Sequence, residues 1–461
     1  MTKNIVFMLA SFVVVLSSCS KDWLDEKPDI STVIPETLQD IQGLLDNASG
    51  IMNTNSPALA EIASDDFYVL ESSYAGLAQN ERNAYIRDKI DSYTQVSDWF
   101  GVGNKNGSYA RVFYCNLALE TLGKIKFDTP SDKETWDNLK GQALFQRSRT
   151  FYELAQVFAN PYNPNTAKNE LGIPLRVESD INIKSVRASV QQTYDQIINN
   201  LLEAKSLLPI NALYKTRASK VSVYALLARI YLNMEQYENA LKNADSCLAL
   251  YNTLLNYNDL SSSASFPIQI MNNEVIFHST MINYVSLALR VLIDDELYSL
   301  YDEHDKRKSV FFGSNANGRT FKGNYSGSRL LFNGLSTNEQ YLIRAECYAR
   351  AGKVPEAMAD LNTLYRNRWD SNEAYIDLTA LDADDALRQV LLERRKELLL
   401  RGLRWSDLRR LNRDPRFAIT LTRTIAGETY TLEPNSYKYT FPIPDDIIEI
   451  TGMPQNPGWE R

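Results

Sequence analysis

Apolar residues recur at intervals of three and four positions along most of this chain, while runs of alternating apolar and polar residues are few and short. Because an α-helix makes one turn in about 3.6 residues, this spacing predicts helices that bury one face. Beyond the repeats described next, we expect helices over 108–122, 137–159, 189–208 and from Asp384 to about Leu411. Pro209 ends the helix at 189–208. Asp384 and Asp385 suit the N-terminus of the last helix, where the helix dipole is positive.

Two helix pairs share one pattern of large and small residues, which is typical of tetratricopeptide repeats. Small residues let the paired helices approach closely, and large ones fill the space around that contact. The matching residues are Tyr224, Leu227, Ala228, Tyr231, Tyr237 and Ala240 in the first pair, and Tyr341, Ala345, Tyr348, Gly352 and Ala357 in the second. We expect Tyr224, Tyr231 and Tyr348 to lie in the core. The prediction is a mainly α fold, a tetratricopeptide-like scaffold of about four helix pairs with an irregular, loop-rich insertion subdomain.

Two segments interrupt the repeats. Residues 60–107 are irregular and rich in aromatic residues, and residues 251–336 carry no repeat but include a strand-like run at 275–277. The second segment also has a stretch of glycines, asparagines and serines between Gly313 and Gly334. Long insertions on a repeat scaffold often carry function, so we expect both segments to take part in ligand binding.

The N-terminus has the features of a secretory signal. Lys3 precedes an apolar run from Ile5 to Leu16, which is too short to span a bilayer, and small residues lead to Cys19. Residues 16–19 resemble the bacterial lipobox, in which the cysteine is acylated. We therefore predict a signal peptide at 1–18 and a mature domain from 19 to 461, held in the membrane by lipid on Cys19. Ser20, rather than aspartate, favours the outer membrane, and the alternative is an ordinary signal peptide with a chance cysteine.

Charge and cysteine usage exclude several classes of function. The formal net charge of −8, without a basic tract, argues against binding to nucleic acid. The remaining cysteines, Cys115, Cys247 and Cys347, lie far apart in helical patterns, which indicates buried free thiols.

Known catalytic motifs are absent from the sequence. Only His278 and His304 could serve a nucleophilic triad, and neither lies in a recognisable motif. Asp65 and Asp66 are expected at a helix start, and the balanced charges of 393–397 are typical of a solvated helix face. We predict a protein that is not an enzyme, with no cofactor and no metal site.

Several segments in order resemble the SusD/RagB family of outer-membrane nutrient-binding lipoproteins. The mature start has a cysteine followed by Leu24, Asp25 and Pro28, and the chain ends in Pro-Ile-Pro and Gln-Asn-Pro-Gly motifs. Between them, the matching stretches are 139–175, 189–209, 217–241, 345–369 and 391–413. Gln142 and Arg401 stand where the family has glutamates, which predicts the loss of internal ion pairs.

This resemblance implies a function and a partner. A family member lies as a lid over a TonB-dependent channel of the SusC type, captures a nutrient, usually a glycan, and releases it inward. The residues themselves leave an alternative open, a tetratricopeptide scaffold that docks peptides or proteins in an envelope complex. The two aromatic insertions favour the nutrient-binding protein, because a bare scaffold would not need them.

Aromatic residues outside the repeats are the candidates for the ligand site, since a sugar ring can pack its C–H face on an aromatic plane. Trp99 is the leading candidate, because glycines and asparagines follow it in the chain. The full set is Trp99, Tyr74, Asn104, Tyr284 and Tyr325. The alternative for Trp99 is that it simply fills the repeat surface.

Overall fold

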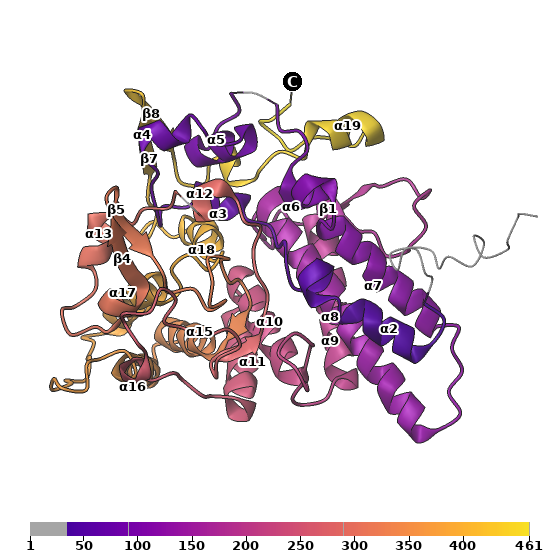
Figure 1. The fold of residues 1–461 in the computed structure, drawn as a ribbon, viewed down its shortest axis with the longest axis horizontal. Coiled ribbons are helices and arrows are strands. Elements are labelled where there is room, and N and C mark those ends of the chain that lie inside the picture. Colours follow the sequence, from indigo (N-terminus) through magenta and orange to yellow (C-terminus); the bar gives the residue numbers. More distant parts are fainter. Residues whose placement is uncertain (1–34, 91, 289, 461) are drawn as a thin grey trace, which may run out of the picture. The chain divides into compact units, whose positions relative to one another are not determined.

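The computed structural model describes residues 35–90, 92–288 and 290–460, of which Thr37 onwards forms one unit (Figure 1). The predicted signal peptide at 1–18 and Cys19 lie outside the described residues. Within the described part of the chain, none of the helices combines the length and apolarity needed to cross a bilayer.

Long helices pack side by side to build the scaffold. Helix α7 packs on α8, α8 on α9, α10 on α11, and α15 on α11, α16 and α17. The bounds are α7 Ser108–Leu122, α8 Pro130–Phe158, α9 Val190–Leu207, α10 Lys220–Asn233, α11 Tyr237–Leu250, α15 Thr337–Arg350, α16 Val354–Arg366, α17 Ala383–Glu397 and α18 Arg404–Leu411. The mainly α, tetratricopeptide-like fold predicted from the sequence is confirmed.

Shorter elements cover this scaffold. The short helices are α2 Leu38–Leu45, η4 Ala48–Met52, α3 Leu59–Ala63, α4 Glu71–Tyr74, α5 Gln79–Ile86, α6 Ser97–Phe100, η5 Val102–Asn104, η6 Tyr257–Asp259, α12 Val285–Ala288, α13 Asp295–Ser299, α14 Arg307–Phe311, η7 Tyr437–Tyr439 and α19 Asp445–Thr451. Antiparallel strand pairs join β1 Leu171–Pro174 with β2 Arg187–Ser189, β3 Val275–Phe277 with β6 Leu335–Ser336, β4 Phe312–Asn315 with β5 Gly318–Phe321, and β7 Leu421–Ile425 with β8 Glu428–Leu432.

Polar caps determine where the long helices begin. The Thr129 side chain accepts a hydrogen bond from the Asp132 amide, and Pro130 occupies the first turn, so α8 starts earlier than the predicted residue 137. Ser189 and Gln192 form a reciprocal capping box at α9. These caps satisfy backbone N–H groups that have no partner within the helix.

Small residues bring the repeat helices together, as predicted. Ala228 on α10 and Ala240 on α11 are fully buried in one cluster with Cys347 on α15. Cys115, Cys247 and Cys347 are all buried and free, which confirms the sequence interpretation. The three repeat tyrosines predicted to lie in the core are instead partly buried and pack against its margin. They are Tyr224, Tyr231 and Tyr348.

The helix predicted from Asp384 to Leu411 is two helices. Asp382 caps α17, with Asp384 and Asp385 in its first turn, but the chain leaves the helix after Glu397. Leu400 and Gly402 then adopt positive φ angles of 55° and 72°. The Gly402 amide donates a 2.9 Å hydrogen bond to Glu61 Oε2, so a tertiary contact holds this turn.

The charged run at 393–397 is buried, which corrects the predicted solvated helix face. Glu393, Arg394, Lys396 and Glu397 all lie in the interior. Burial acts to raise the pKa of Glu393, but Arg307 and Lys396 outweigh it and lower that pKa to about 2. The run is buried because distant residues supply counter-charges, which composition alone does not show.

The acidic pair Asp65 and Asp66 also differs from its predicted position. Asp65 and Asp66 follow the end of α3 rather than start a helix, and Asp65 Oδ1 accepts a 2.7 Å hydrogen bond from Arg404 Nε.

Gln142 and Arg401, the two departures from the family pattern, are buried, and neither forms an ion pair with any residue that the structure describes. The Arg401 guanidinium lies instead 4.4 Å from the Phe332 ring centroid.

Candidate functional site

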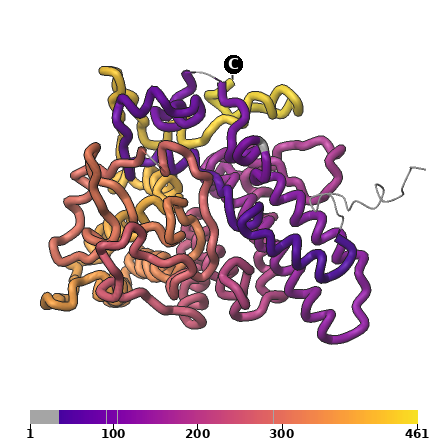
Figure 2. Tube along the Cα trace, viewed as in Figure 1, coloured from indigo at the N-terminus to yellow at the C-terminus, as the bar shows by residue number. Residues whose placement is uncertain are grey.

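The two irregular segments meet at an antiparallel β-bridge between Tyr68 and Leu292. The Tyr68 amide donates to the Leu292 carbonyl at 2.8 Å, and the reverse bond is 2.9 Å. The Ile293 amide donates at 2.9 Å to the Arg319 carbonyl, which adds the β4–β5 hairpin to the same junction. Figure 2 traces these segments from far apart in the sequence, purple and orange, to neighbouring positions.

A cavity of about 550 Å³ lies at this junction, within the range of small-molecule sites. We call it the junction cavity. Its walls include Ser73, Phe266, Arg290, Asn315, Asn317, Phe321, Lys322 and Arg329. A smaller hollow of about 300 Å³ adjoins it and shares Ser73, Arg290 and Asn317.

The β4–β5 turn places asparagines on the wall of the junction cavity. Asn315 pairs with Gly318 across the hairpin, and its side-chain oxygen accepts a 2.8 Å bond from the Asn317 amide. Gly318 has a φ of 140°, which a residue with a Cβ rarely adopts, and an added Cβ would lie 3.3 Å from the Tyr68 hydroxyl. The glycine therefore allows both the tight turn and the close approach of the first segment.

Most polar side chains of the junction cavity have no partner among the residues that the structure describes. Among the described residues, the side chains of Ser73, Arg290, Asn317 and Arg329 make neither a hydrogen bond nor an ion pair with one another or with the rest of the chain. Groups of this kind are free to exchange water for a ligand hydroxyl.

Two phenyl rings provide the aromatic part of the junction cavity. Phe266 and Phe321 are each half-buried, and the Phe321 ring packs edge-on against Phe311 at 5.6 Å between centroids. A half-buried ring is held in place by its neighbours and still offers surface to a ligand. The cavity thus combines ring surface with free donors and acceptors.

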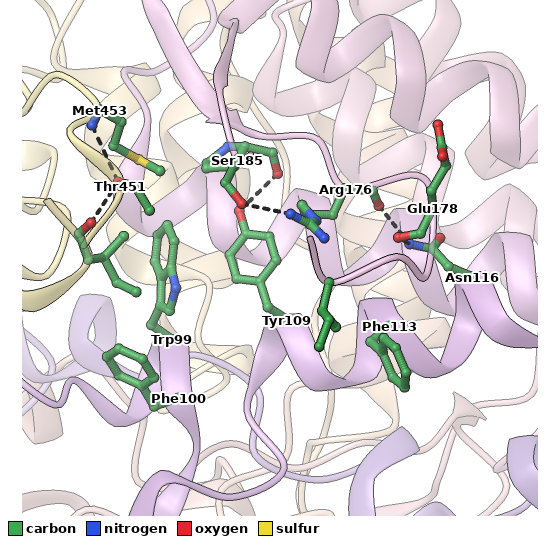
Figure 3. Close-up of a pocket in the computed structure, with 13 residues that line it drawn as sticks. Trp99, Phe100, Tyr109, Phe113, Asn116, Arg176, Glu178, Ser185, Thr451 and Met453 are labelled. Carbon is green, nitrogen blue, oxygen red and sulfur yellow. Dashed lines mark hydrogen bonds between the residues drawn. The ribbon is translucent and has the colours of Figure 1, made fainter. Parts of the chain in front are cut away.

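Trp99 lies at a different cavity, of about 580 Å³, which Figure 3 shows and which we call the Trp99 cavity. Helix α6 supplies Trp99 and Phe100, and α7 supplies Tyr109, Phe113 and Asn116. Gly101, with a φ of 84°, turns the chain between these helices, and an added Cβ there would collide with the Lys105 carbonyl oxygen.

The indole of Trp99 serves mainly as packing. Trp99 is only 6% exposed. Its ring lies 4.7 Å from that of Tyr109 and meets Phe158 edge-on at 5.2 Å. A ring enclosed in this way has little face left for a sugar.

Polar groups of the Trp99 cavity are engaged within the protein. The Asn116 amide donates to the carbonyls of Arg176 and Glu178, at 3.0 Å each. The Tyr109 hydroxyl donates to the Pro174 carbonyl at 3.0 Å, and Arg176 Nη1 donates to Ser185 Oγ at 3.1 Å. These bonds, several of them dashed in Figure 3, brace the loop between β1 and β2. They leave fewer free partners for a ligand than the junction cavity offers.

The structure does not bring the sequence-predicted site residues into one site. Tyr284 is buried, and its hydroxyl donates to Asp98 Oδ2 at 2.7 Å, which places it close to the Trp99 segment. Burial raises the pKa of Asp98 to about 6. Tyr325 is 1% exposed, and its hydroxyl donates at 2.5 Å to Glu274, which also forms a buried ion pair with Arg368.

Tyr74 lines neither cavity. Tyr74 is half-buried on α4, beside the junction, and its ring lies 5.8 Å from that of Tyr85. Asn104 ends the short helix η5, and its side chain lies outside the described residues. The lining residues that sequence reasoning missed are Phe266, Arg290, Asn317, Phe321, Lys322 and Arg329. Their only signal was their place in the second irregular segment.

Both histidines pack against aromatic rings. His278 is buried, and burial lowers its pKa to about 4, while the His304 ring lies 5.4 Å from that of Trp369. Within the described residues, no three His, Cys, Asp or Glu side chains are grouped so that they could hold a metal ion.

Two family models match this chain. Residues 22–232 match a model described as starch-binding and associating with the outer membrane, and residues 337–459 match the model of the SusD family. No curated protein matches the chain.

Solved structures share the fold over most of the chain. A putative sugar binding protein from Bacteroides vulgatus is 22% identical with a TM-score of 0.73, covering 93% of this chain and 100% of its own. A SusD superfamily protein from Bacteroides thetaiotaomicron is 18% identical with a TM-score of 0.70, covering 91% and 100%. At these identities the likeness establishes the fold alone.

Proposed function

The chain belongs to the SusD/RagB family, and on this basis we propose that it binds a nutrient, an oligosaccharide or polysaccharide, at the bacterial outer membrane. It passes the ligand to a TonB-dependent channel of the SusC type for import, and it does so as a binding protein rather than an enzyme. The family model described as starch-binding supports the ligand class. Residues 1–18 are the signal peptide, and Cys19 of the domain 19–461 carries the lipid.

The junction cavity is the ligand site in this proposal. The observation that carries it is a set of polar side chains, without a partner in the described part of the chain, beside two half-buried rings, Phe266 and Phe321. Sugar hydroxyls need donors and acceptors, and the C–H face of a sugar needs a flat apolar partner. The Trp99 cavity has more rings, but most of its polar groups are already engaged.

A glycan-binding panel on the full-length protein in detergent tests this site. Phe321→Ala is expected to weaken binding by about tenfold, equivalent to about 1.4 kcal/mol, because it removes a ring that packs on the sugar. Asn317→Ala, in an exposed turn, is expected to weaken binding without changing the melting temperature. Phe127→Ala is the matched control, since Phe127 is exposed between α7 and α8. If Phe321→Ala and Asn317→Ala both bind the glycan as tightly as the wild type, the ligand site is not the junction cavity.

The anchor and the channel are tested together by mild detergent extraction of membranes. The wild-type chain is expected to carry fatty acid and to be recovered from the outer membrane with a large integral β-barrel protein. Cys19→Ala is expected to lose the label and to leave the membrane fraction, because lipid on this residue is its only anchor in the proposal. Full acylation of the variant would refute the lipobox, and recovery of lipidated wild-type chain alone would count against the importer.

A further inference from the structure

The junction cavity is strongly cationic although the chain as a whole is acidic. Arg290, Lys322 and Arg329 line it, and none of the other described lining residues carries a carboxylate. The whole sequence carries a formal net charge of −8. The Trp99 cavity, in contrast, has Glu178 beside Arg176. A basic composition of the whole chain therefore does not explain why three cations line this cavity.

None of these three cations forms an ion pair within the described part of the chain. Nearby Arg319 shows the usual arrangement, since it pairs with Asp295 and stacks over the Tyr298 ring at 3.6 Å. Lys322 Nζ donates to the Ser262 carbonyl at 2.5 Å, a neutral partner, and burial lowers the pKa of Lys322. Among the residues that the structure describes, no acidic side chain therefore pairs with these three cations.

Cations that share a small cavity repel one another unless an anion joins them. A guanidinium presents a planar fork of donors that matches a carboxylate or a sulfate, and an ammonium acts as a compact charge beside it. Meanwhile Phe266, Phe321 and Asn317 supply the ring surface and the amide that a sugar requires. The cavity combines both kinds of contact in one place.

We propose that the junction cavity selects acidic saccharides, whose carboxylate or sulfate groups pair with Arg290, Lys322 and Arg329. This inference rests on the proposed function and narrows its ligand class. The neutral part of the sugar packs on the two rings. An uncharged saccharide of the same size would leave the three cations without a counter-charge, and it would bind more weakly.

Matched pairs of polymers test the selectivity on the full-length protein in detergent. Polygalacturonate is compared with its methyl ester, and sulfated dextran with dextran, by calorimetry at low and high salt. At low salt we expect one acidic polymer to bind at least tenfold more tightly than its neutral partner. Added salt should reduce that preference. The carboxylate and sulfate pairs separate the two sources of charge.

A charge-matched control isolates the cavity from the overall field. The triple variant R290Q/K322Q/R329Q is expected to lose the preference for the acidic polymer. The control K124Q/K126Q/K242Q removes the same charge from exposed positions outside this cavity and is expected to keep it. Equal loss in both triple variants, or equal binding of acidic and neutral polymers to the wild type, would overturn the selectivity while glycan binding stands. Failure to bind any saccharide in the panel would overturn the proposed function as well.

Discussion

Replacing Arg368 by methionine is expected to destabilise the protein by about 3–5 kcal/mol, because it leaves buried Glu274 without a counter-charge and Glu397 with one fewer. Arg368 Nη2 lies 2.7 Å from Glu274 and 2.6 Å from Glu397, and all three side chains are fully buried. Glu397 keeps Arg307 at 2.8 Å, so one ion pair survives. Chemical denaturation of the purified variant measures the loss.

Arg366→Met is the matched control for this substitution. Arg366 ends α16 two positions earlier and pairs with Asp377, but both side chains are about half exposed, at 54% and 53%. An exposed pair contributes about 0–1 kcal/mol, so this variant should be nearly as stable as the wild type. Equal losses in the two variants would show that the buried cluster contributes no more than a surface pair.

Acid should narrow the gap between Arg368→Met and the wild type. Burial acts to raise the pKa of Glu397, but Arg368 and Arg307 outweigh it and hold that pKa below its ordinary value of 4.5. A depressed pKa stabilises the fold above the unfolded-state pKa, and this stabilisation is lost as the pH falls through the folded-state value. The difference between the two proteins is therefore largest near neutral pH and shrinks below about pH 4.5. A gap that widens in acid would contradict the assignment to buried carboxylates.

Trp99→Ala is expected to cost about 3–5 kcal/mol of stability, the scale for truncating a buried aromatic side chain. The indole packs between Tyr109 and Phe158 and is nearly inaccessible, so its removal leaves a hole at the contact of α6 with α7 and α8. Thermal and denaturant unfolding of the full-length protein measure this loss.

Phe113→Ala is the control for the Trp99 variant, since Phe113 lines the same cavity on α7 but is only half-buried. It should cost clearly less stability. Trp99→Phe should keep both the fold and glycan binding. If Trp99→Ala instead keeps its melting temperature and weakens glycan binding, Trp99 is a ligand platform, and the assignment to the junction cavity is wrong.

Local sequence determined the scaffold of this protein. Helix periodicity and cap residues act within a few positions, so α7, with its bounds 108–122, was predicted to the residue. The small residues Ala228 and Ala240 predicted the close packing of α10 and α11, because few residue types allow such an approach. The order of motifs along the chain, from the mature N-terminus to the Gln-Asn-Pro-Gly ending, indicates the family by itself.

Tertiary structure decided the charges and the site. Glu393 and Glu397 are buried only because Arg307 and Arg368 reach them from other elements, and no local pattern records such partners. The junction cavity exists because Tyr68 pairs with Leu292, more than two hundred positions away in the chain. Aromatic residues such as Trp99 and Tyr325 could be chosen from sequence as ligand candidates, but whether a ring faces a cavity or the core depends on which distant side chains pack against it.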